Sequence, residues 1–377
     1  MKVFIIAGES SGDLLGGKLL KCLKEEINDI SVKGIGGDNL ISNGLSSIFH
    51  QKEIAVNGFI EVIPHIPNIL SKINETVKAI LEFKPDLIIT IDAPDFNFRV
   101  IKKLKNKTLN FNCKIVHYVA PTVWAYRAKR AEKIAKLYDL LLVILPFEPK
   151  YFEKYGLKTK FIGHPIFKDF NQTEIAKKSK NIIITPGSRK SEIYRFAPIL
   201  KEFIYLVKSN FGNKFTINLF VTNEIKDKLY QIYNNEISKD EIKMINKESQ
   251  KNEILQNCHL AILKSGTNTM EMANKSIPMI IFYKFNFLTY FILSKIYRVK
   301  VKYANLLNYQ ANNMIIPEFL HSRCKANLIY QEFRNYNYHD EKRNIQVDGY
   351  SKIIAKFKNP DNISPELCAV KAIKDLL

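Results

Sequence analysis

In the stretch Ile182-Ile183-Ile184-Thr185-Pro186-Gly187-Ser188-Arg189, an apolar run leads into a turn of small and polar residues. The run is typical of a buried strand, and a helical pattern begins at Glu192-Ile193, directly after the turn. Strand, turn and helix in this order form a βα unit, the repeating element of a parallel sheet. The turn of such a unit lies at the carboxyl end of the strand, where open parallel sheets bind ligands.

A second turn of small residues occurs at Ser265-Gly266-Thr267-Asn268-Thr269-Met270-Glu271. The first N–H groups of a helix have no partner within the helix, so a diphosphate can dock there. Arg189 can neutralise the charge of a leaving phosphate, and Glu271 can accept hydrogen bonds from both hydroxyls of a ribose. The alternatives are a helix capped by Ser265 or Thr267 and a surface arginine. Two such turns in one βα array favour a site for a nucleotide diphosphate.

The whole chain alternates strand-like runs with helical patterns. Residues 3–7 form an apolar run, and Leu15, Leu19, Leu23 and Ile27 then recur at intervals of four. With 377 residues, the chain is too long for one typical core and fits two domains. A polar, lysine-rich stretch at residues 168–180 marks the expected junction. The pattern therefore predicts an α/β fold with two domains.

Several carboxylates follow strands of the first half. Asp92 comes directly after the apolar run 87–91, Asp95 follows within the next turn, and Glu9 and Asp13 follow the first strand. We expect all four at the edge of the sheet where the strands end. A carboxylate there can act as a general base towards an attacking hydroxyl. Aspartates after strands also form turns and cap helices, and that alternative stays open for Asp95.

Short motifs spread over residues 3 to 330 resemble, in the same order, those of the lipid-A-disaccharide synthase family. They lie at residues 8–13, 56–62, 91–97, 117–127, 145–148, 163–165, 186–189, 265–267, 305–307 and 317–320. The resemblance implies two Rossmann-like domains that face each other across a cleft (GT-B type), with a C-terminal helix crossing back to the first domain. The implied domains are an N-terminal acceptor- and lipid-binding domain (1–167), a UDP-sugar-binding domain (168–350) and a C-terminal helical segment (351–377).

The resemblance also implies an inverting glycosyltransferase that uses neither a metal nor a cofactor. The family transfers 2,3-diacylglucosamine from its UDP ester to the 6-hydroxyl of 2,3-diacylglucosamine 1-phosphate (lipid X). UDP-2,3-diacylglucosamine and lipid X are therefore the expected small-molecule partners. The products are the lipid A disaccharide 1-phosphate and UDP, in the lipid A biosynthesis of Gram-negative bacteria. A homodimer is suggested as well.

Roles are assigned to individual residues by the same resemblance. Asp92 is the expected general base, and Asp95 is the second candidate. The expected substrate-binding residues are Gly187, Ser188, Arg189, Ser265, Gly266 and Thr267 for the UDP phosphates, Glu271 for the ribose, Asn305 for the nucleotide or donor sugar, and Glu9, Asp13 and Asn57 for the acceptor.

The charge balance and two apolar segments bear on location. Lys and Arg exceed Asp and Glu by 57 to 37, a net charge of +20 that favours acidic partners. The lysines are scattered, and no zinc finger or RNP pattern supports nucleic-acid binding. Residues 62–70 are expected to form an apolar entrance, while residues 277–297 carry Lys284 and Lys295 and make no clean membrane span. Without a secretory signal, we expect a cytoplasmic protein at the anionic face of the inner membrane.

The cysteines and histidines indicate no metal or disulfide. The five cysteines include no closely spaced pair, and the seven histidines lack zinc-site spacing. An Asp-x-Asp pattern is also missing, so we expect Arg189 and a helix terminus to stabilise the leaving group.

Two other classes of protein share some of these features. UDP-sugar 2-epimerases and other two-domain glycosyltransferases share a Ser-Gly turn with a downstream Glu, and the N-terminal motifs separate this chain from them. A basic nucleic-acid binder is the third class, which salt-dependent DNA retention without UDP binding would support.

Overall fold

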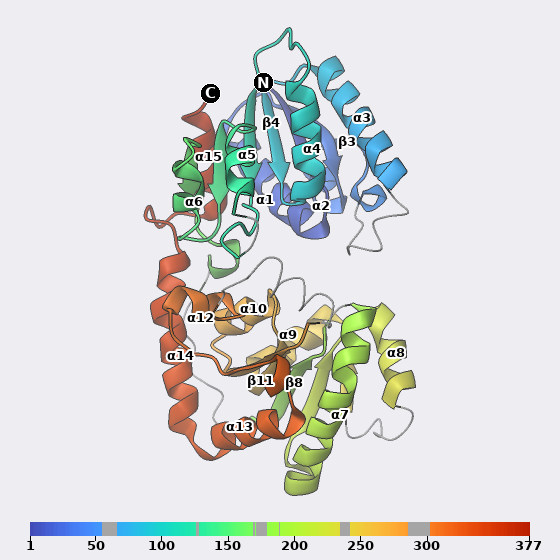
Figure 1. Ribbon diagram of the computed structural model, residues 1–377, viewed down its shortest axis with the longest axis vertical. Coiled ribbons are helices and arrows are strands. Elements are labelled where there is room, and N and C mark those ends of the chain that lie inside the picture. The colour runs from blue at the N-terminus through green and yellow to red at the C-terminus, as the bar shows by residue number, and fades with distance from the viewer. Residues whose placement is uncertain are drawn as a thin grey trace. The chain divides into compact units, whose positions relative to one another are not determined.

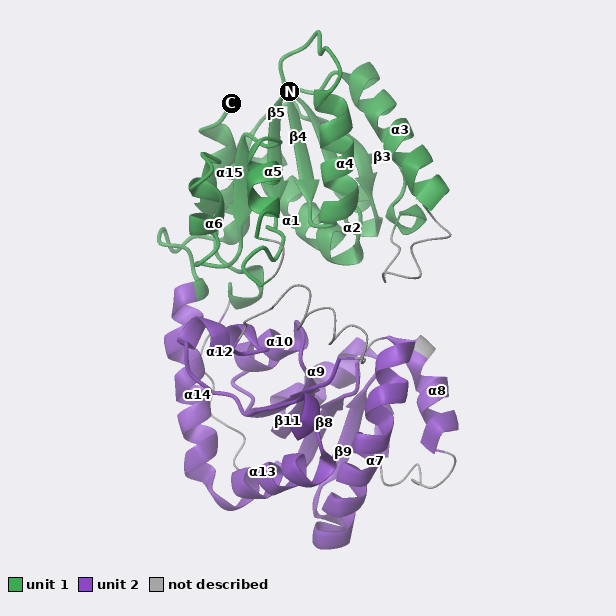
Figure 2. Cartoon of the chain, viewed as in Figure 1, with its two compact units in different colours: residues 1–168, 357–377 green, residues 169–356 purple. Residues whose placement is uncertain are grey.

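The computed structural model describes residues 1–54, 66–125, 128–168, 170, 179–187, 189–233, 242–285 and 302–377. The chain forms two compact units, shown in different colours in Figure 2. Unit 1 comprises Met1–Lys168 and Phe357–Leu377, and unit 2 comprises Asp169–Lys356. Each unit has its own parallel sheet flanked by helices (Figure 1), which confirms the predicted α/β class with two Rossmann-like domains.

Unit 1 contains a seven-stranded sheet in the order β3-β2-β1-β4-β5-β6-β7. Its strands are β1 (Lys2–Ala7), β2 (Ser31–Gly36), β3 (Ser46–His50), β4 (Leu87–Ile91), β5 (Lys114–Tyr118), β6 (Leu140–Val143) and β7 (Thr159–Phe161). Its helices are α1 (Ser10–Glu26), α2 (Asp38–Ser42), α3 (Ile66–Phe83), α4 (Pro94–Lys105), α5 (Arg130–Ala135), α6 (Pro149–Glu153) and α15 (Pro365–Lys374). Short 3-10 helices occupy Gln51–Glu53 and Pro165–Phe167.

The central strands of unit 1 are apolar on both faces because helices cover both faces. Alternate residues of a strand point to opposite sides, so β1 sends Phe4 and Ile6 into one core and Val3 and Ile5 into the other. The first core includes the buried faces of α3 and α4, and the second includes those of α1 and α15. Both faces of the sheet are therefore sealed, which leaves its ends as the places where a ligand can reach the strands.

The strand order of unit 1 reverses between β1 and β4. β1 pairs in parallel with β2 on one side and with β4 on the other. The connections after β1 and β4 therefore leave the sheet in opposite directions, and a crevice forms at their carboxyl ends. Glu9 and Asp92 follow these two strands, as the sequence indicates.

Unit 2 contains a six-stranded parallel sheet in the order β10-β9-β8-β11-β12-β13, and its order reverses between β8 and β11. Its strands are β8 (Asn181–Thr185), β9 (Thr216–Phe220), β10 (Ile242–Ile245), β11 (Cys258–Lys264), β12 (Met279–Tyr283) and β13 (Glu318–Leu320). Its helices are α7 (Lys190–Phe211), α8 (Asn223–Tyr233), α9 (Glu248–Gln256), α10 (Asn268–Asn274), α12 (Leu306–Ala311), α13 (Ala326–Tyr338) and α14 (Asp340–Ile354). A 3-10 turn follows at Gly212–Lys214, another at His321–Arg323, and a third at Ala355–Phe357.

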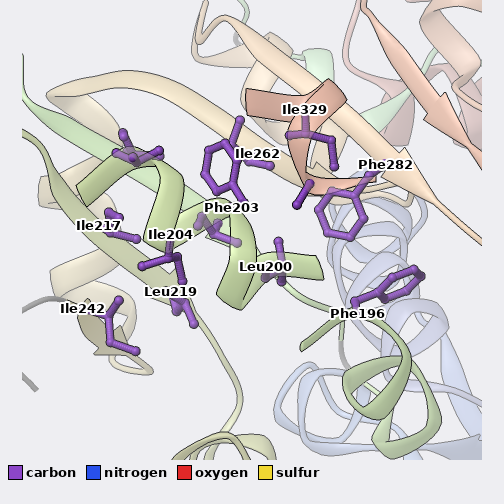
Figure 3. Packing of buried hydrophobic residues seen from close by; sticks show 14 of the residues in the cluster. Phe196, Leu200, Phe203, Ile204, Ile217, Leu219, Ile242, Ile262, Phe282 and Ile329 are labelled. Carbon is purple, nitrogen blue, oxygen red and sulfur yellow. The ribbon is translucent and has the colours of Figure 1, made fainter. Parts of the chain in front are cut away.

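The core of unit 2 forms where α7 lies against the sheet. Phe196, Leu200 and Phe203 of α7 pack against strand residues such as Ile262 and Phe282 (Figure 3). The buried positions of α7 recur every three or four residues, the spacing of one helix face. This packing fixes the helix that begins at the Pro-Gly-Ser-Arg turn.

The C-terminal segment returns to unit 1, as predicted. Helix α15 begins with Ser364 as N-cap, whose Oγ accepts a hydrogen bond from the N–H of Leu367 (3.2 Å), and it packs against α1. Before it, the buried Asn359 donates to the carbonyl of Ile162 (2.9 Å). Residues 351–356, which the sequence analysis grouped with this segment, belong to unit 2.

Within the described part of the chain, no helix is long and apolar enough to cross a membrane. Of the predicted apolar segment 277–297, Met279–Tyr283 is a strand inside the sheet of unit 2, and residues 286–297 lie outside the described residues. Residues 62–65 of the predicted entrance at residues 62–70 also lie outside them. The described part, Ile66 to Leu70, is the first turn of α3, where Ile66 and Leu70 are exposed.

Candidate active site

The backbone of unit 1 takes an unusual course at Asp92. Asp92 and Ala93 have φ values of 49° and 40°, in the left-handed region that residues other than glycine rarely adopt. Each such residue costs on the order of 1–3 kcal/mol and persists only where its surroundings enforce it. Gly8 makes room for the turn, because a Cβ atom on it would lie 2.8 Å from the Cβ of Ala93. The loops after β1 and β4 are therefore in close contact.

Hydrogen bonds hold the turn in this conformation. Asn97, whose side chain is fully buried, donates from Nδ2 to the carbonyl oxygens of Asp92 (2.7 Å) and Ile91 (3.3 Å). The N–H of Asp92 donates to the carbonyl of Tyr118 on the neighbouring strand (2.9 Å). Asn97 thus belongs to the site, although the sequence analysis gave it no role.

The carboxylate of Asp92 is oriented by α1. The hydroxyl of Ser11 donates to Asp92 Oδ2 at 3.0 Å. Glu9, which precedes α1, is half-buried, and its carbonyl accepts from the N–H of Asp13 (2.9 Å). Two of the predicted carboxylates, Glu9 and Asp92, therefore lie at the strand ends on either side of the crevice.

Asp95 is engaged in an ion pair. Its Oδ1 lies 2.6 Å from Nη2 of Arg130, whose guanidinium also stacks over the Phe98 ring at 5.0 Å. One oxygen of the Asp95 carboxylate is therefore occupied by a charged hydrogen bond. The two candidate carboxylates thus differ in their contacts, because Asp92 accepts from the neutral hydroxyl of Ser11 and Asp95 from a guanidinium.

Asp13 lies inside unit 1 and not on its edge. Its side chain is 2% exposed and accepts four hydrogen bonds, from Gly37 N (2.7 Å), Leu40 N (3.1 Å), Asn39 N (3.0 Å) and Asn39 Nδ2 (2.9 Å). Burial alone would raise the pKa of Asp13, but these hydrogen bonds hold it below the ordinary value of 3.8. Four bonds fill the acceptor capacity of a carboxylate. The acceptor-binding role expected for Asp13 is therefore replaced by a structural one, at the start of α2.

Two other titratable groups lie in the core beneath this edge. His117 is fully buried beside Thr90, with 2.7 Å between Nδ1 and Oγ1, and burial lowers its pKa to about 3. Glu148 accepts from the N–H of Leu145 (3.1 Å), and burial raises its pKa to about 8. Neither group reaches the crevice, so both support the fold.

His164, near the end of the first part of unit 1, is also structural. Its backbone N–H donates to the carbonyl of Phe357 at 2.8 Å.

In unit 2, the two predicted phosphate turns are neighbours. They follow β8 and β11, which pair with each other, and the side chain of Asn268 donates to Thr185 Oγ1 across them (2.6 Å). Gly187 has a φ of 110°, a conformation that favours glycine, and Arg189 is exposed at the start of α7. The structure therefore brings Gly187 and Arg189 to the same edge as the second turn.

The second turn presents backbone N–H groups. Both donors of Ser265 have partners within the protein. Its N–H donates to the carbonyl of Phe282, and its hydroxyl donates to the carbonyl of Ala304 (both 3.1 Å). Among the described residues, the N–H groups of Gly266 and Thr267 have no acceptor. Further along α10, Glu271 is half-buried; burial, and then the charge of Glu248, raises its pKa.

The buried Asn305 connects three elements of unit 2 through its hydrogen bonds. Its Oδ1 accepts from the N–H of Leu307 (2.8 Å) as N-cap of α12, and its Nδ2 donates to Thr269 Oγ1 (2.8 Å). Its own N–H donates to Glu318 Oε1 at 3.0 Å. Only 2% of the surface of Asn305 is exposed, and its polar groups bond to Thr269 of α10 and Glu318 of β13. Asn305 therefore contacts the helix that follows the second turn through Thr269.

An ion pair that was not predicted from the sequence lies at this edge. Lys264 Nζ lies 3.0 Å from Glu192 Oε1, while the N–H of Arg189 faces Glu192 Oε2 at 3.4 Å. Glu192 was used only to mark the start of a helix, and Lys264 was given no role. The remaining predicted residues, Asn57 and Ser188, lie outside the described residues. No group of three or more potential metal ligands was found in the described ranges.

Known proteins share the sequence pattern and the fold of this chain. A family model described as lipid-A-disaccharide synthetase matches residues 3–373. The chain is similar to the lipid-A-disaccharide synthases of Rickettsia bellii (strain OSU 85-389), at 37% identity over 383 residues, and Rickettsia typhi (strain ATCC VR-144 / Wilmington), at 38% over 387 residues. In both comparisons the match covers 99% of this chain and 98% of the relative.

Two solved structures are similar in fold. The S. aureus MnaA-UDP co-structure has a TM-score of 0.65 at 12% identity, covering 100% of this chain and 97% of that one. UDP-GlcNAc 2-epimerase from Neisseria meningitidis bound to UDP-GlcNAc has a TM-score of 0.63 at 11% identity, covering 100% and 99%. At such identities the likeness shows the fold alone.

Proposed function

Because the chain belongs to the lipid-A-disaccharide synthetase family, we propose that it joins two particular substrates with inversion at the anomeric carbon. The donor is UDP-2,3-diacylglucosamine, and the acceptor is lipid X, which is attacked through its 6-hydroxyl. The products are the β-1,6-linked disaccharide 1-phosphate and UDP. Membership of the family already shows that the chain makes the lipid A disaccharide, and the proposal adds the two substrates and the inversion.

The observation that carries this mechanism is the orientation of the Asp92 carboxylate by Ser11 at 3.0 Å. Asp92 takes the proton of the acceptor 6-hydroxyl as that oxygen attacks the anomeric carbon of the donor. The bond from this carbon to the UDP oxygen breaks at the same time, and UDP leaves with the bonding electrons. A single displacement of this kind inverts the anomeric centre. The strained turn and its hydrogen bonds support a fixed base, since catalysis depends on positioning.

The donor binds at the β8/β11 edge of unit 2 in this proposal. The N–H groups of Gly266 and Thr267 and the exposed Arg189 stabilise the diphosphate, whose negative charge grows as UDP leaves. Glu271 accepts from the ribose, and its half-buried position supports that role. The fold shared with proteins whose structures contain UDP and UDP-GlcNAc is consistent with a nucleotide-sugar donor.

The acceptor and its acyl chains bind to unit 1 in this proposal, with Glu9 and Asn57 on the acceptor sugar. The exposed Ile66 and Leu70 belong to the segment predicted to form an apolar entrance. With the net charge of +20, they support peripheral binding to the anionic cytoplasmic face of the inner membrane.

A direct assay tests the function. The protein is incubated in detergent micelles with UDP-2,3-diacylglucosamine, radiolabelled lipid X and EDTA. We expect a disaccharide whose new linkage is β by NMR coupling constants. A product with an α linkage would contradict inversion. Epimerisation of unacylated UDP-GlcNAc, without disaccharide from the acylated pair, would favour the epimerase alternative.

A further inference from the structure

A partly buried cation lies beside the second turn of unit 2. Lys264 is the last residue of β11, and its side chain is only 19% exposed. Its ammonium group contacts Glu192, whose side chain is 5% exposed, at 3.0 Å. Most of the lysine side chain is therefore buried, and its ammonium group is paired, whereas a typical surface lysine extends into solvent.

This ammonium group lies close to the second turn. A Cβ atom built on Gly266 would lie 3.5 Å from Asn268 Oδ1 and 3.8 Å from Lys264 Nζ, so the ammonium group is a near neighbour of the Gly266 backbone. A ligand that approaches the N–H groups of the turn therefore comes within reach of the cation. Gly266 was predicted to bind the diphosphate, and Lys264 is its near neighbour in space.

Glu192 connects this cation to the first turn. Its Oε1 holds Lys264, and its Oε2 faces the N–H of Arg189 at 3.4 Å. A Cβ atom on Gly187 would lie 2.6 Å from the same Oε2, so the first turn packs directly on the carboxylate. One buried side chain thus fixes the position of Lys264 relative to both turns.

We propose that Lys264 binds the diphosphate of the nucleotide-sugar donor as a second cation beside Arg189, with Glu192 as its positioning residue. The inference rests on the proposed function, because it concerns the same donor site. An ammonium group is a point charge that suits phosphate oxygens. Since Glu192 already holds it, little reorganisation is needed when charge develops on the leaving UDP. Glu192 also offsets the cost of burying the lysine while the site is empty.

Titration calorimetry on the full chain tests the inference with UDP and uridine as probes. Lys264→Met removes the charge and keeps the length of the side chain. We expect its affinity for UDP to fall about ten- to a hundredfold, the range for a hydrogen bond to a charged group, while uridine binding stays unchanged. Lys264→Arg should restore most of the UDP affinity. Lys243→Met is the matched control, an exposed lysine of β10 in the same unit.

Lys264→Met removes the ion pair of the buried Glu192, and this can destabilise the unit. The double variant with Lys264→Met and Glu192→Gln removes both charges and should fold like the wild type, as judged by circular dichroism, yet bind UDP as weakly as the single variant. Wild-type affinity for UDP in the double variant, or an equal loss for uridine, would overturn the inference. If the wild type bound neither UDP nor uridine, the proposed function itself would fail.

Discussion

At the scale of single residues, the contact between Ser11 and Asp92 gives a sharp prediction. Ser11 touches the base and not the substrate in the proposed mechanism, so Ser11→Ala should lower kcat about tenfold and leave KM nearly unchanged. Ser11→Thr keeps the hydroxyl and should recover activity. Ser10→Ala, an exposed neighbour in the same helix turn, is the control. A Ser11→Ala enzyme with wild-type kcat would remove the orienting role.

Individual residues also differ in whether their positions can be predicted from the sequence. Asp92 could be predicted at the sheet edge because it follows a continuous apolar run. The burial of Asp13 could not, because its partners, Gly37, Asn39 and Leu40, lie 24 to 27 residues further along the chain, at the start of α2. The contact of Glu192 with Lys264 likewise joins residues distant in the chain, which only the strand order brings together.

At the scale of elements, the strands divide by their position in the sheet. The apolar runs at residues 3–7, 87–91 and 182–185 match the central strands β1, β4 and β8 to within about one residue. Four strands were missed, namely β3, β7, β10 and β13, and these are the edge strands of the two sheets. An edge strand is short and partly exposed, so it lacks the continuous apolar run that marks a buried parallel strand. In β7, for example, none of the three residues is fully buried.

The start of α2 depends on Asp13, and this predicts a pH effect. Because its pKa in the folded protein lies below 3.8, Asp13 contributes stability above that pH and loses it as the pH falls through the folded-state value. At pH 6, Asp13→Asn should lower the free energy of unfolding by about 1–3 kcal/mol. The difference from the wild type should shrink below pH 3.8.

Urea unfolding followed by the fluorescence of Trp124 measures this effect, since Trp124 is the only tryptophan and lies in unit 1. Asp38→Asn, an exposed carboxylate at the same helix start, is the control. A difference between Asp13→Asn and wild type that stays constant from pH 6 to pH 3 would contradict the account.

At the scale of the whole molecule, the C-terminal segment completes unit 1 after the chain has formed unit 2. Val370 and Ile373 of α15 are fully buried in the core that contains Leu19 and Leu23. Deletion of residues 364–377 should therefore destabilise unit 1 by about 3 kcal/mol or more, since two large apolar side chains leave the core. Trp124 fluorescence should report an earlier transition, while UDP binding, assigned to unit 2, should persist. An unchanged Trp124 transition would show that α15 contributes little.

The central claim is that this chain makes the lipid A disaccharide with Asp92 as general base. The most direct measurement compares wild type, Asp92→Asn and Asp95→Asn in the micelle assay, with UDP affinity measured on the same samples. The account predicts that Asp92→Asn binds UDP normally but turns over about 10²- to 10⁴-fold more slowly, while Asp95→Asn keeps most of its activity. An active Asp92→Asn enzyme beside an inactive Asp95→Asn enzyme would contradict the assignment.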